Sequence, residues 1–146
     1  MVIDGQPVNE ARLRKYLIIN VDDQGHFCPI EAHVSQPGIP DYSYTINGIN
    51  GWLELKFGTA AKPPHLRVMQ KIWLERNIKH GGNPLVLVGA VIDDHLEFGI
   101  AHGNKAGKMA AAKINKDWMA CCTTVWLDRV VWSEFLAILC NPWSQA

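Results

Sequence analysis

A β-hairpin signal in the first half of the chain constrains the fold more than any other feature. The segment 42–46 is rich in β-forming residues, and it leads into an Asn-Gly pair at 47–48 that is typical of tight hairpin turns. In the segment 52–56 leucines alternate with other side chains, so Glu54 and Lys56 project from one face of a second strand. The sequence therefore predicts two neighbouring strands with a carboxylate and an ammonium group side by side.

Such a hairpin would also bring Asp41, at the start of the first strand, close to Glu54 and Lys56. Mg²⁺ is usually held by one or two carboxylates together with waters and phosphate oxygens. It polarises a phosphodiester and lowers the pKa of an attacking water. A neighbouring lysine can orient that water or neutralise charge on the phosphoryl group. The alternative is an ordinary hairpin with a solvated, charged face, because this spacing of acids and lysine is common.

A first helix is predicted at 10–18, with Asn9 as its N-cap. Glu10 falls on the same stripe as Leu13 and Leu17. An acid on the inward face of a helix is a candidate metal ligand. The alternative is an acid in the first turn that the helix dipole favours.

A first strand is predicted at 27–34, where Pro29 indicates a sheet edge or a bulge. Glu31 lies in this segment, ten residues before Asp41. It would join the acidic cluster if this strand pairs beside the Asp41 strand. The alternative is a carboxylate that faces solvent.

A second helix is predicted at 65–80, ending at the glycine pair 81–82. Gln70 lies on the apolar stripe of this helix between Leu66 and Trp73. An inward-facing amide needs hydrogen-bond partners. A nearby site with a lysine, a water or a phosphate would supply them, and backbone groups are the alternative.

The remaining segments predict a single α/β domain, a mixed central β-sheet flanked by helices. A continuous apolar strand, an alternating strand and a Lys- and Ala-rich segment come first, followed by a further strand segment and a last helix, at 85–91, 95–101, 103–116, 118–127 and 128–140.

Composition restricts the partners of the chain. The 146 residues suffice for one domain with a core, and the formal net charge is zero. A strongly basic nucleic-acid binder is therefore disfavoured. Residues 54–116 nevertheless hold ten basic and five acidic side chains, which indicates either a basic face or a solvated helix surface.

The longest apolar run, 85–92, contains a glycine and is too short to span a membrane. The N-terminus lacks the charged-then-apolar form of a signal peptide. We therefore expect a cytoplasmic protein without a membrane partner.

Three short motifs in this order resemble the PD-(D/E)XK nuclease superfamily. They are Pro40-Asp41, the tripeptide 54–56 (Glu-Leu-Lys) and Gln70. The Gly-Ile-Pro-Asp and Gly-Trp-Leu-Glu-Leu-Lys strings are more narrowly similar to small phage-encoded nucleases of the VRR-NUC and Holliday-junction-resolvase-like branch. The similarity covers about 8–101 of a single domain at 1–146, and leaves a C-terminal helical extension at about 105–146.

The resemblance implies a restriction-endonuclease-like fold and Mg²⁺- or Mn²⁺-dependent hydrolysis of DNA. Asp41 and Glu54 would bind the metal together with the Leu55 carbonyl, and Lys56 would position the attacking water. Gln70 would support the site. Members of the family often carry another acid upstream; of Glu10 and Glu31 we prefer Glu31, which lies in the strand that precedes the motif.

The implied function is that of a metal-dependent DNA endonuclease acting on branched DNA such as a Holliday junction, as a homodimer, in the cytoplasm of a phage-infected host. The neutral charge departs from many resolvases. A noncatalytic nucleic-acid-binding module that retains the fold, and a sequence-specific nuclease of the homing type, are the alternatives.

Overall fold

The computed structural model describes residues 7–31 and 37–145, which form one α/β domain built around a mixed six-stranded sheet. The strands lie in sequence order across the sheet, and only β3 and β4 are parallel. The predicted fold class is confirmed. The strands are β1 (His26–Pro29), β2 (Tyr42–Ile46), β3 (Ile49–Gly58), β4 (Leu85–Ile92), β5 (His95–His102) and β6 (Thr124–Leu127).

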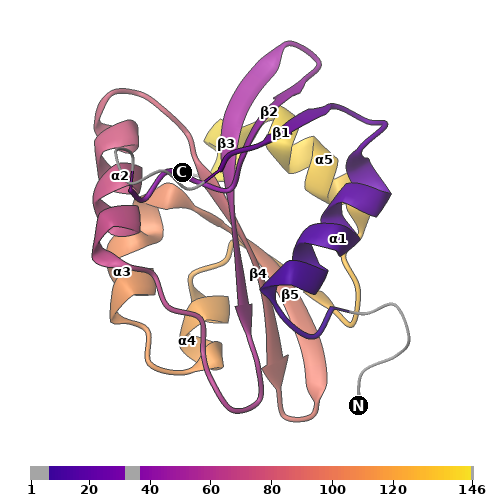
Figure 1. The fold of residues 1–146 in the computed structure, drawn as a ribbon, viewed down its shortest axis with the longest axis vertical. Coiled ribbons are helices and arrows are strands. Elements are labelled where there is room, and N and C mark those ends of the chain that lie inside the picture. Colours follow the sequence, from indigo (N-terminus) through magenta and orange to yellow (C-terminus); the bar gives the residue numbers. More distant parts are fainter. Residues whose placement is uncertain (1–6, 32–36, 146) are drawn as a thin grey trace.

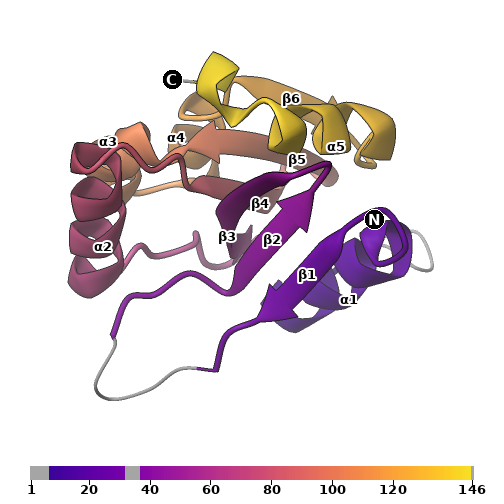
Figure 2. The same cartoon turned by 90° about the horizontal axis from the view of Figure 1, so that it is seen from above.

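Helices cover both faces of the sheet, in three layers (Figure 1). One face carries α1 and α5, and the other carries α2, α3 and α4, as the view from above also shows (Figure 2). The helices are α1 (Glu10–Val21), α2 (Val68–Lys79), α3 (Ala106–Ala111), α4 (Asn115–Ala120) and α5 (Trp132–Cys140), with 3₁₀ turns at Gly103–Lys105 and Pro142–Gln145. Because β3 and β4 are parallel, the chain must cross over between them, and α2 is that crossover.

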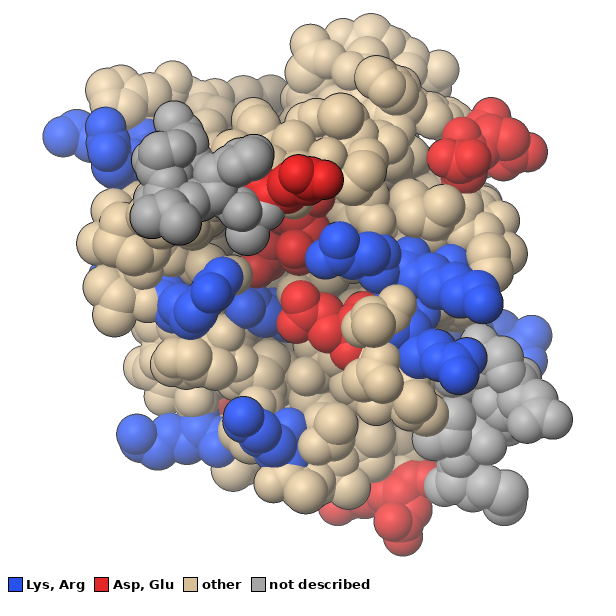
Figure 3. Space-filling view, in the orientation of Figure 1, with Lys and Arg blue, Asp and Glu red and all other residues tan. Residues whose placement is uncertain are grey.

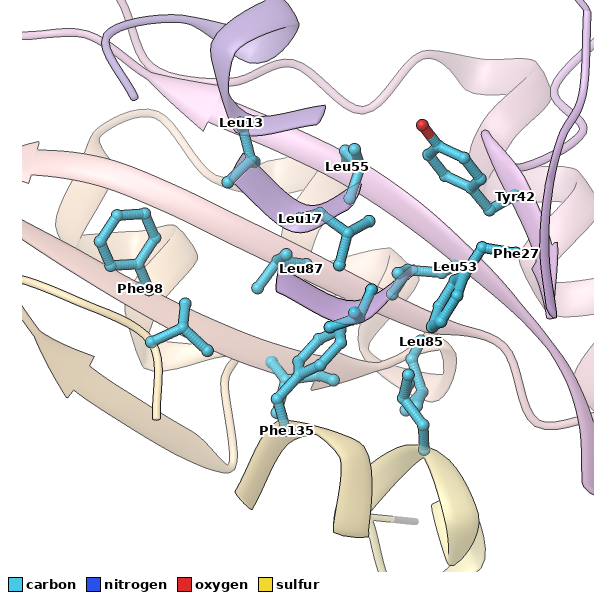
Figure 4. Close-up of a cluster of buried hydrophobic side chains, with 14 of the residues drawn as sticks. Leu13, Leu17, Phe27, Tyr42, Leu53, Leu55, Leu85, Leu87, Phe98 and Phe135 are labelled. Carbon is cyan, nitrogen blue, oxygen red and sulfur yellow. The ribbon is translucent and has the colours of Figure 1, made fainter. Parts of the chain in front are cut away.

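The sheet has a separate hydrophobic core on each face. Leucines of β3 and β4 meet Leu13 and Leu17 of α1 and Phe135 of α5 in the first core (Figure 4). In the second core, Val86 and Val88 of β4 pack with α2, α3 and α4. Strand alternation in β3 divides its side chains between the two faces.

The hairpin has the predicted turn and register. Asn47 and Gly48 both have positive φ angles, 50° and 79°, as a two-residue hairpin loop of the primed type requires. Ile46 pairs with Ile49, and Tyr42 pairs with Leu53. This register fixes which side chains of β2 lie beside which side chains of β3.

Two helices begin later than the sequence predicts. The segment before α2 is extended, because its carbonyl groups make tertiary hydrogen bonds: Trp118 Nε1 donates to the Pro64 oxygen, and Lys56 Nζ donates to the His65 oxygen. α5 begins only at Trp132, and the Val130 N–H before it donates to the Tyr16 hydroxyl.

Two predicted strands are shorter than expected. β1 ends at Pro29, and positions 32–34 of the predicted strand 27–34 lie outside the described residues. The predicted strand segment 118–127 divides into the end of α4, which buries Trp118, and the strand β6. Within the described part of the chain, no helix is both long and apolar enough to cross a bilayer.

Candidate active site

The two carboxylates of the hairpin lie next to each other at the end remote from the turn. The Asp41 N–H donates to Glu54 Oε1 at 3.1 Å, and the Leu55 N–H donates to Asp41 Oδ2 at 2.8 Å. Both hydrogen bonds involve the backbone of paired strands, so the relative position of the carboxylates is set by the sheet. Since Leu53 and Leu55 face the α1 core, Glu54 faces the opposite side, towards α2.

Lys56 is buried on the same face, with only 6% of its surface exposed. Its Nζ donates to Gln70 Oε1 and to the His65 carbonyl oxygen, each at 2.8 Å. It also lies 3.5 Å from Oε2 of Glu54, which is itself 3% exposed. A buried ammonium group is tolerated only when it is paired and hydrogen-bonded, and these three contacts meet that requirement.

Gln70 joins the acid to the lysine. Its Nε2 donates to Glu54 Oε2 at 2.6 Å, while its Oε1 accepts from Lys56 Nζ and from the Arg67 N–H at 3.0 Å. The donors and acceptors fix the orientation of the amide, with nitrogen towards the carboxylate and oxygen towards the ammonium group. Gln70 is buried, as its place on the apolar stripe predicted. Its oxygen has both kinds of partner that the sequence suggested, a lysine (Lys56) and a backbone group (the Arg67 N–H).

Arg14 of α1 reaches Asp41 from the face of the sheet that α1 covers. Its Nη2 donates to Asp41 Oδ1 at 3.1 Å, and its guanidinium lies 5.6 Å from the centre of the Tyr42 ring. Sequence reasoning did not single out Arg14. The available signal was its position one helical turn after Glu10, which places both residues on one side of α1.

Of the two upstream acids, the structure places Glu10, and not Glu31, at this pocket. Glu10 lines the same pocket as Asp41 and Glu54. Glu31 is exposed, lies beyond the end of β1 and does not line the pocket. The geometry therefore favours Glu10 over Glu31, and the role of either acid stays a prediction.

The pocket has a volume of about 490 Å³ and combines both signs of charge. Three carboxylates line it, together with Lys56 and the exposed cations Lys62 and Arg67. Acidic side chains gather at the middle of this side of the molecule, with Lys and Arg side chains on both sides of them (Figure 3). The pocket therefore offers oxygen ligands at its centre and cations at its margin.

Two carboxylates of the pocket, Glu54 and Glu10, hold their protons more tightly than usual. Burial, and then the negative charge of Asp41, raise the pKa of Glu54 well above its usual range, and Lys56 only partly opposes this. Partial burial and the charge of Asp41 also raise the pKa of Glu10. A bound cation would lower both pKa values, because it would offset the repulsion between neighbouring carboxylates.

The donor set fits a hard divalent ion. Carboxylate oxygens are the ligands that Mg²⁺ and Mn²⁺ prefer. Among the described residues, no three His, Cys, Asp or Glu side chains already stand as a ligand cluster. The Asp41 oxygens accept from Arg14 and Leu55, so a metal at Oδ1 would compete with the Arg14 cation. Leu55 does not line the pocket, and its carbonyl as a ligand stays a prediction.

Comparisons of the chain with protein-family models, with curated proteins and with solved structures found no significant match. Any function for this pocket must therefore be argued from its residues and their geometry.

Proposed function

We propose that this protein is a metal-dependent endodeoxyribonuclease whose active site is the pocket around Glu54. One observation carries the proposal. Asp41, Glu54, Lys56 and Gln70 form a continuous hydrogen-bonded cluster at a pocket that Glu10 also lines. Two or three carboxylates beside a buried lysine are a suitable set of groups for phosphodiester hydrolysis.

Asp41, Glu54 and Glu10 would hold Mg²⁺ or Mn²⁺. When bound, such an ion polarises the phosphodiester and lowers the pKa of an attacking water. Burial is the main reason why the pKa values of Glu54 and Glu10 are raised, and repulsion from the negative charge of Asp41 raises both further. That stored repulsion favours uptake of a cation.

Lys56 would orient the attacking water and stabilise charge on the phosphoryl group. Gln70 and the His65 carbonyl hold two of its three N–H groups, so the ammonium group is positioned before substrate binds. The further contact of Nζ is the ion pair with Glu54 Oε2 at 3.5 Å, which leaves the third N–H without a short hydrogen bond among the described residues. It is the group available to a water or a phosphate oxygen.

Lys62 and Arg67 would contact the DNA backbone. Both are exposed and both line the pocket, so a phosphate placed at the carboxylates lies within the field of two cations. These contacts do not depend on base sequence. They support a substrate recognised by its shape, such as branched DNA, which is the substrate we favour.

A dimer follows from that substrate. Two active sites are needed to cut both strands of a junction in one encounter, and the described residues form one such pocket, around Glu54. Light scattering at the concentrations used for cleavage tests this point. A monomer only, under conditions where both strands are cut together, contradicts it.

The test of the nuclease proposal is cleavage of a plasmid and of a four-way junction with Mg²⁺, with Mn²⁺ and with EDTA. We expect cleavage with either metal and none with EDTA. Glu54→Gln and Lys56→Ala should each lose roughly 100-fold or more of the rate, while circular dichroism shows a folded protein. Glu75→Gln and Lys71→Ala, which alter an exposed ion pair on α2, are the matched controls and should retain the rate.

Each alternative has its own outcome in this assay. Binding of the junction without cleavage in any metal contradicts the nuclease proposal and supports a noncatalytic binding module. Cleavage of the plasmid at a single sequence supports a sequence-specific nuclease instead of one that reads branched structure.

A further inference from the structure

A second pocket continues along the hairpin from the candidate active site. It has a volume of about 260 Å³, and we call it the amide pocket; the residues that line it include Ser43, Thr45, Asn50, Trp52, Asn77 and Asn83. Ser43 pairs with Trp52, and Thr45 pairs with Asn50. By strand alternation these pairs share a face with Asp41 and Glu54.

The wall opposite the hairpin is again α2. Trp73 lies one turn after Gln70 on this helix, and Asn77 lies one turn further. The Trp73 ring meets the Trp52 ring edge to face, with the ring centres 5.2 Å apart and an interplanar angle of 70°. Both tryptophans are only partly buried. The hairpin and α2 thus form two continuous walls that lead from the carboxylates to the amide pocket.

The amide pocket contains polar atoms that the described residues leave unsatisfied. Asn83 is 9% exposed, and its Nδ2 is buried without a hydrogen-bond partner; Oδ1 of Asn77 is likewise buried without one. Buried polar atoms in folded proteins nearly always have partners, so such groups need an explanation. One is a donor and the other an acceptor.

The orientation of the Asn83 amide is fixed by His102. Burial lowers the pKa of His102, which keeps the ring neutral, and its Nδ1 accepts a hydrogen bond from the Asn104 N–H. The remaining nitrogen, Nε2, therefore carries the proton and donates to Asn83 Oδ1. With its oxygen engaged in this way, Asn83 can offer only the Nδ2 donor.

We propose that the amide pocket binds the base of an unpaired nucleotide in the DNA substrate, an inference that rests on the proposed nuclease function. A base presents an aromatic face to a tryptophan and a mixed donor and acceptor edge to asparagine amides. Bases inside a duplex do not expose that face, so the nucleotide must be unstacked.

The spacing along the hairpin agrees with this assignment. The Ser43–Trp52 pair lies two residues along the strands from Asp41 and Glu54, a distance of about 6.8 Å. One DNA strand rises about 3.4 Å per nucleotide when stacked, and more when extended. The bound base would therefore belong to a nucleotide within about two positions of the phosphate at the carboxylates.

The test compares binding of two duplexes by fluorescence anisotropy. Both carry a four-nucleotide single-stranded flap, and in one of them every flap nucleotide is abasic. Binding is measured with EDTA and again with Ca²⁺, and gels verify that the DNA is intact. The wild type should bind the complete flap roughly 5- to 150-fold more tightly than the abasic flap, the range for stacking of one base on an aromatic side chain.

Variants assign the preference to the pocket. Trp52→Ala should bring the ratio of the two affinities close to one, Asn77→Ala should lower it, and Trp52→Phe should keep it. Asn20→Ala on α1 and Leu127→Ala on β6 are the surface controls, and they should retain the wild-type ratio. Each variant is compared with itself on the two duplexes, so a general loss of DNA affinity does not change the ratio. If Trp52→Ala does not fold, the ratio of Asn77→Ala is the test.

Several results would overturn the inference. They are a wild-type ratio of one, a ratio unchanged in both pocket variants, no binding of either duplex, or tighter binding of an RNA flap than of the DNA flap. Cleavage with Mg²⁺ and a ratio of one would leave the nuclease proposal standing without the base site. A base-dependent ratio without cleavage in any metal would support the base site and contradict the nuclease.

Discussion

Replacing Gln70 by leucine tests the hydrogen-bonded cluster independently of any activity. The substitution keeps the approximate volume of the side chain, so it leaves little cavity in the protein. It removes the hydrogen bonds from Gln70 Nε2 to Glu54 at 2.6 Å and from Lys56 to Gln70 Oε1 at 2.8 Å. It also removes the acceptor of the Arg67 N–H.

The expected magnitude follows from the partners that remain. Glu54 and Lys56 stay within 3.5 Å of each other, and Lys56 keeps the His65 carbonyl. Each charged group therefore loses one hydrogen bond, and neither is left alone. At about 1.5 kcal/mol for each bond to a charged group, the free energy of unfolding should fall by about 3 kcal/mol. For a domain of this size, that lowers Tm by about 6–12 °C.

The assay is urea unfolding followed by circular dichroism, with the slope against urea checked for equality between the proteins. Gln24→Leu is the matched control, because Gln24 is exposed in a turn and its side chain donates to its exposed neighbour Asp23. Its stability should change by less than about 0.5 kcal/mol. A Gln70→Leu protein as stable as the wild type would refute the view that this amide holds the buried acid and lysine in place.

Three further predictions concern the backbone, pH and metal. Gly38→Ala should lower the free energy of unfolding, measured in urea, by more than about 1 kcal/mol, because Gly38 has φ +86° and its new Cβ would contact the Met69 backbone. The control is Gly107→Ala in α3, where the new Cβ meets open space, and its stability should be unchanged or higher. Because the pKa of Glu54 is raised, the folded state binds the Glu54 proton more tightly than the unfolded state does. The free energy of unfolding of the metal-free wild type, relative to that of Glu54→Gln, should therefore decrease as pH rises from about 4 to about 7. An increase of this relative stability with pH would contradict the assignment. Mg²⁺ at about 100 times its dissociation constant should stabilise the wild type at neutral pH by about 2.7 kcal/mol, as measured by thermal unfolding. The stabilisation should be absent in Asp41→Asn, and it should be weak near pH 4, where protons compete with the metal for the carboxylates.

The hairpin and its charged face could be predicted because they depend on local signals. The Asn-Gly turn fixes the register, and the alternation of leucines with Glu54 and Lys56 fixes the face. Gln70 could be placed because a polar residue on an apolar helical stripe must face inward. These signals act over a few residues, so the sequence displays them directly.

The choice between Glu10 and Glu31 depended on long-range geometry. Both lie on elements expected beside the hairpin, and only the order of the strands and the position of the first helical turn decide which carboxylate reaches the pocket. The contact of Arg14 with Asp41 is likewise a meeting of two elements distant in sequence. The start of α2 was mispredicted for a similar reason, since distant side chains use the carbonyl groups that a longer helix would have used.

The asparagines of the amide pocket carried no signal at all in the sequence. Asn77 and Asn83 lie on a helix and in a loop, where asparagine is common. Their proposed role in binding depends on burial and on missing hydrogen-bond partners, which only the three-dimensional structure reveals. A pocket built from such residues is therefore visible only after the chain has been folded.

Anomalous diffraction from crystals soaked in Mn²⁺ tests most directly whether the carboxylates converge on one cation. We predict a peak between Asp41 and Glu54, at about 2.1 Å from their nearest carboxylate oxygens, with Arg14 moved away from Asp41. The same soak of the Glu54→Gln protein should show a weaker peak or none. Manganese bound only elsewhere on the molecule, with the Arg14–Asp41 pair intact, would contradict the account.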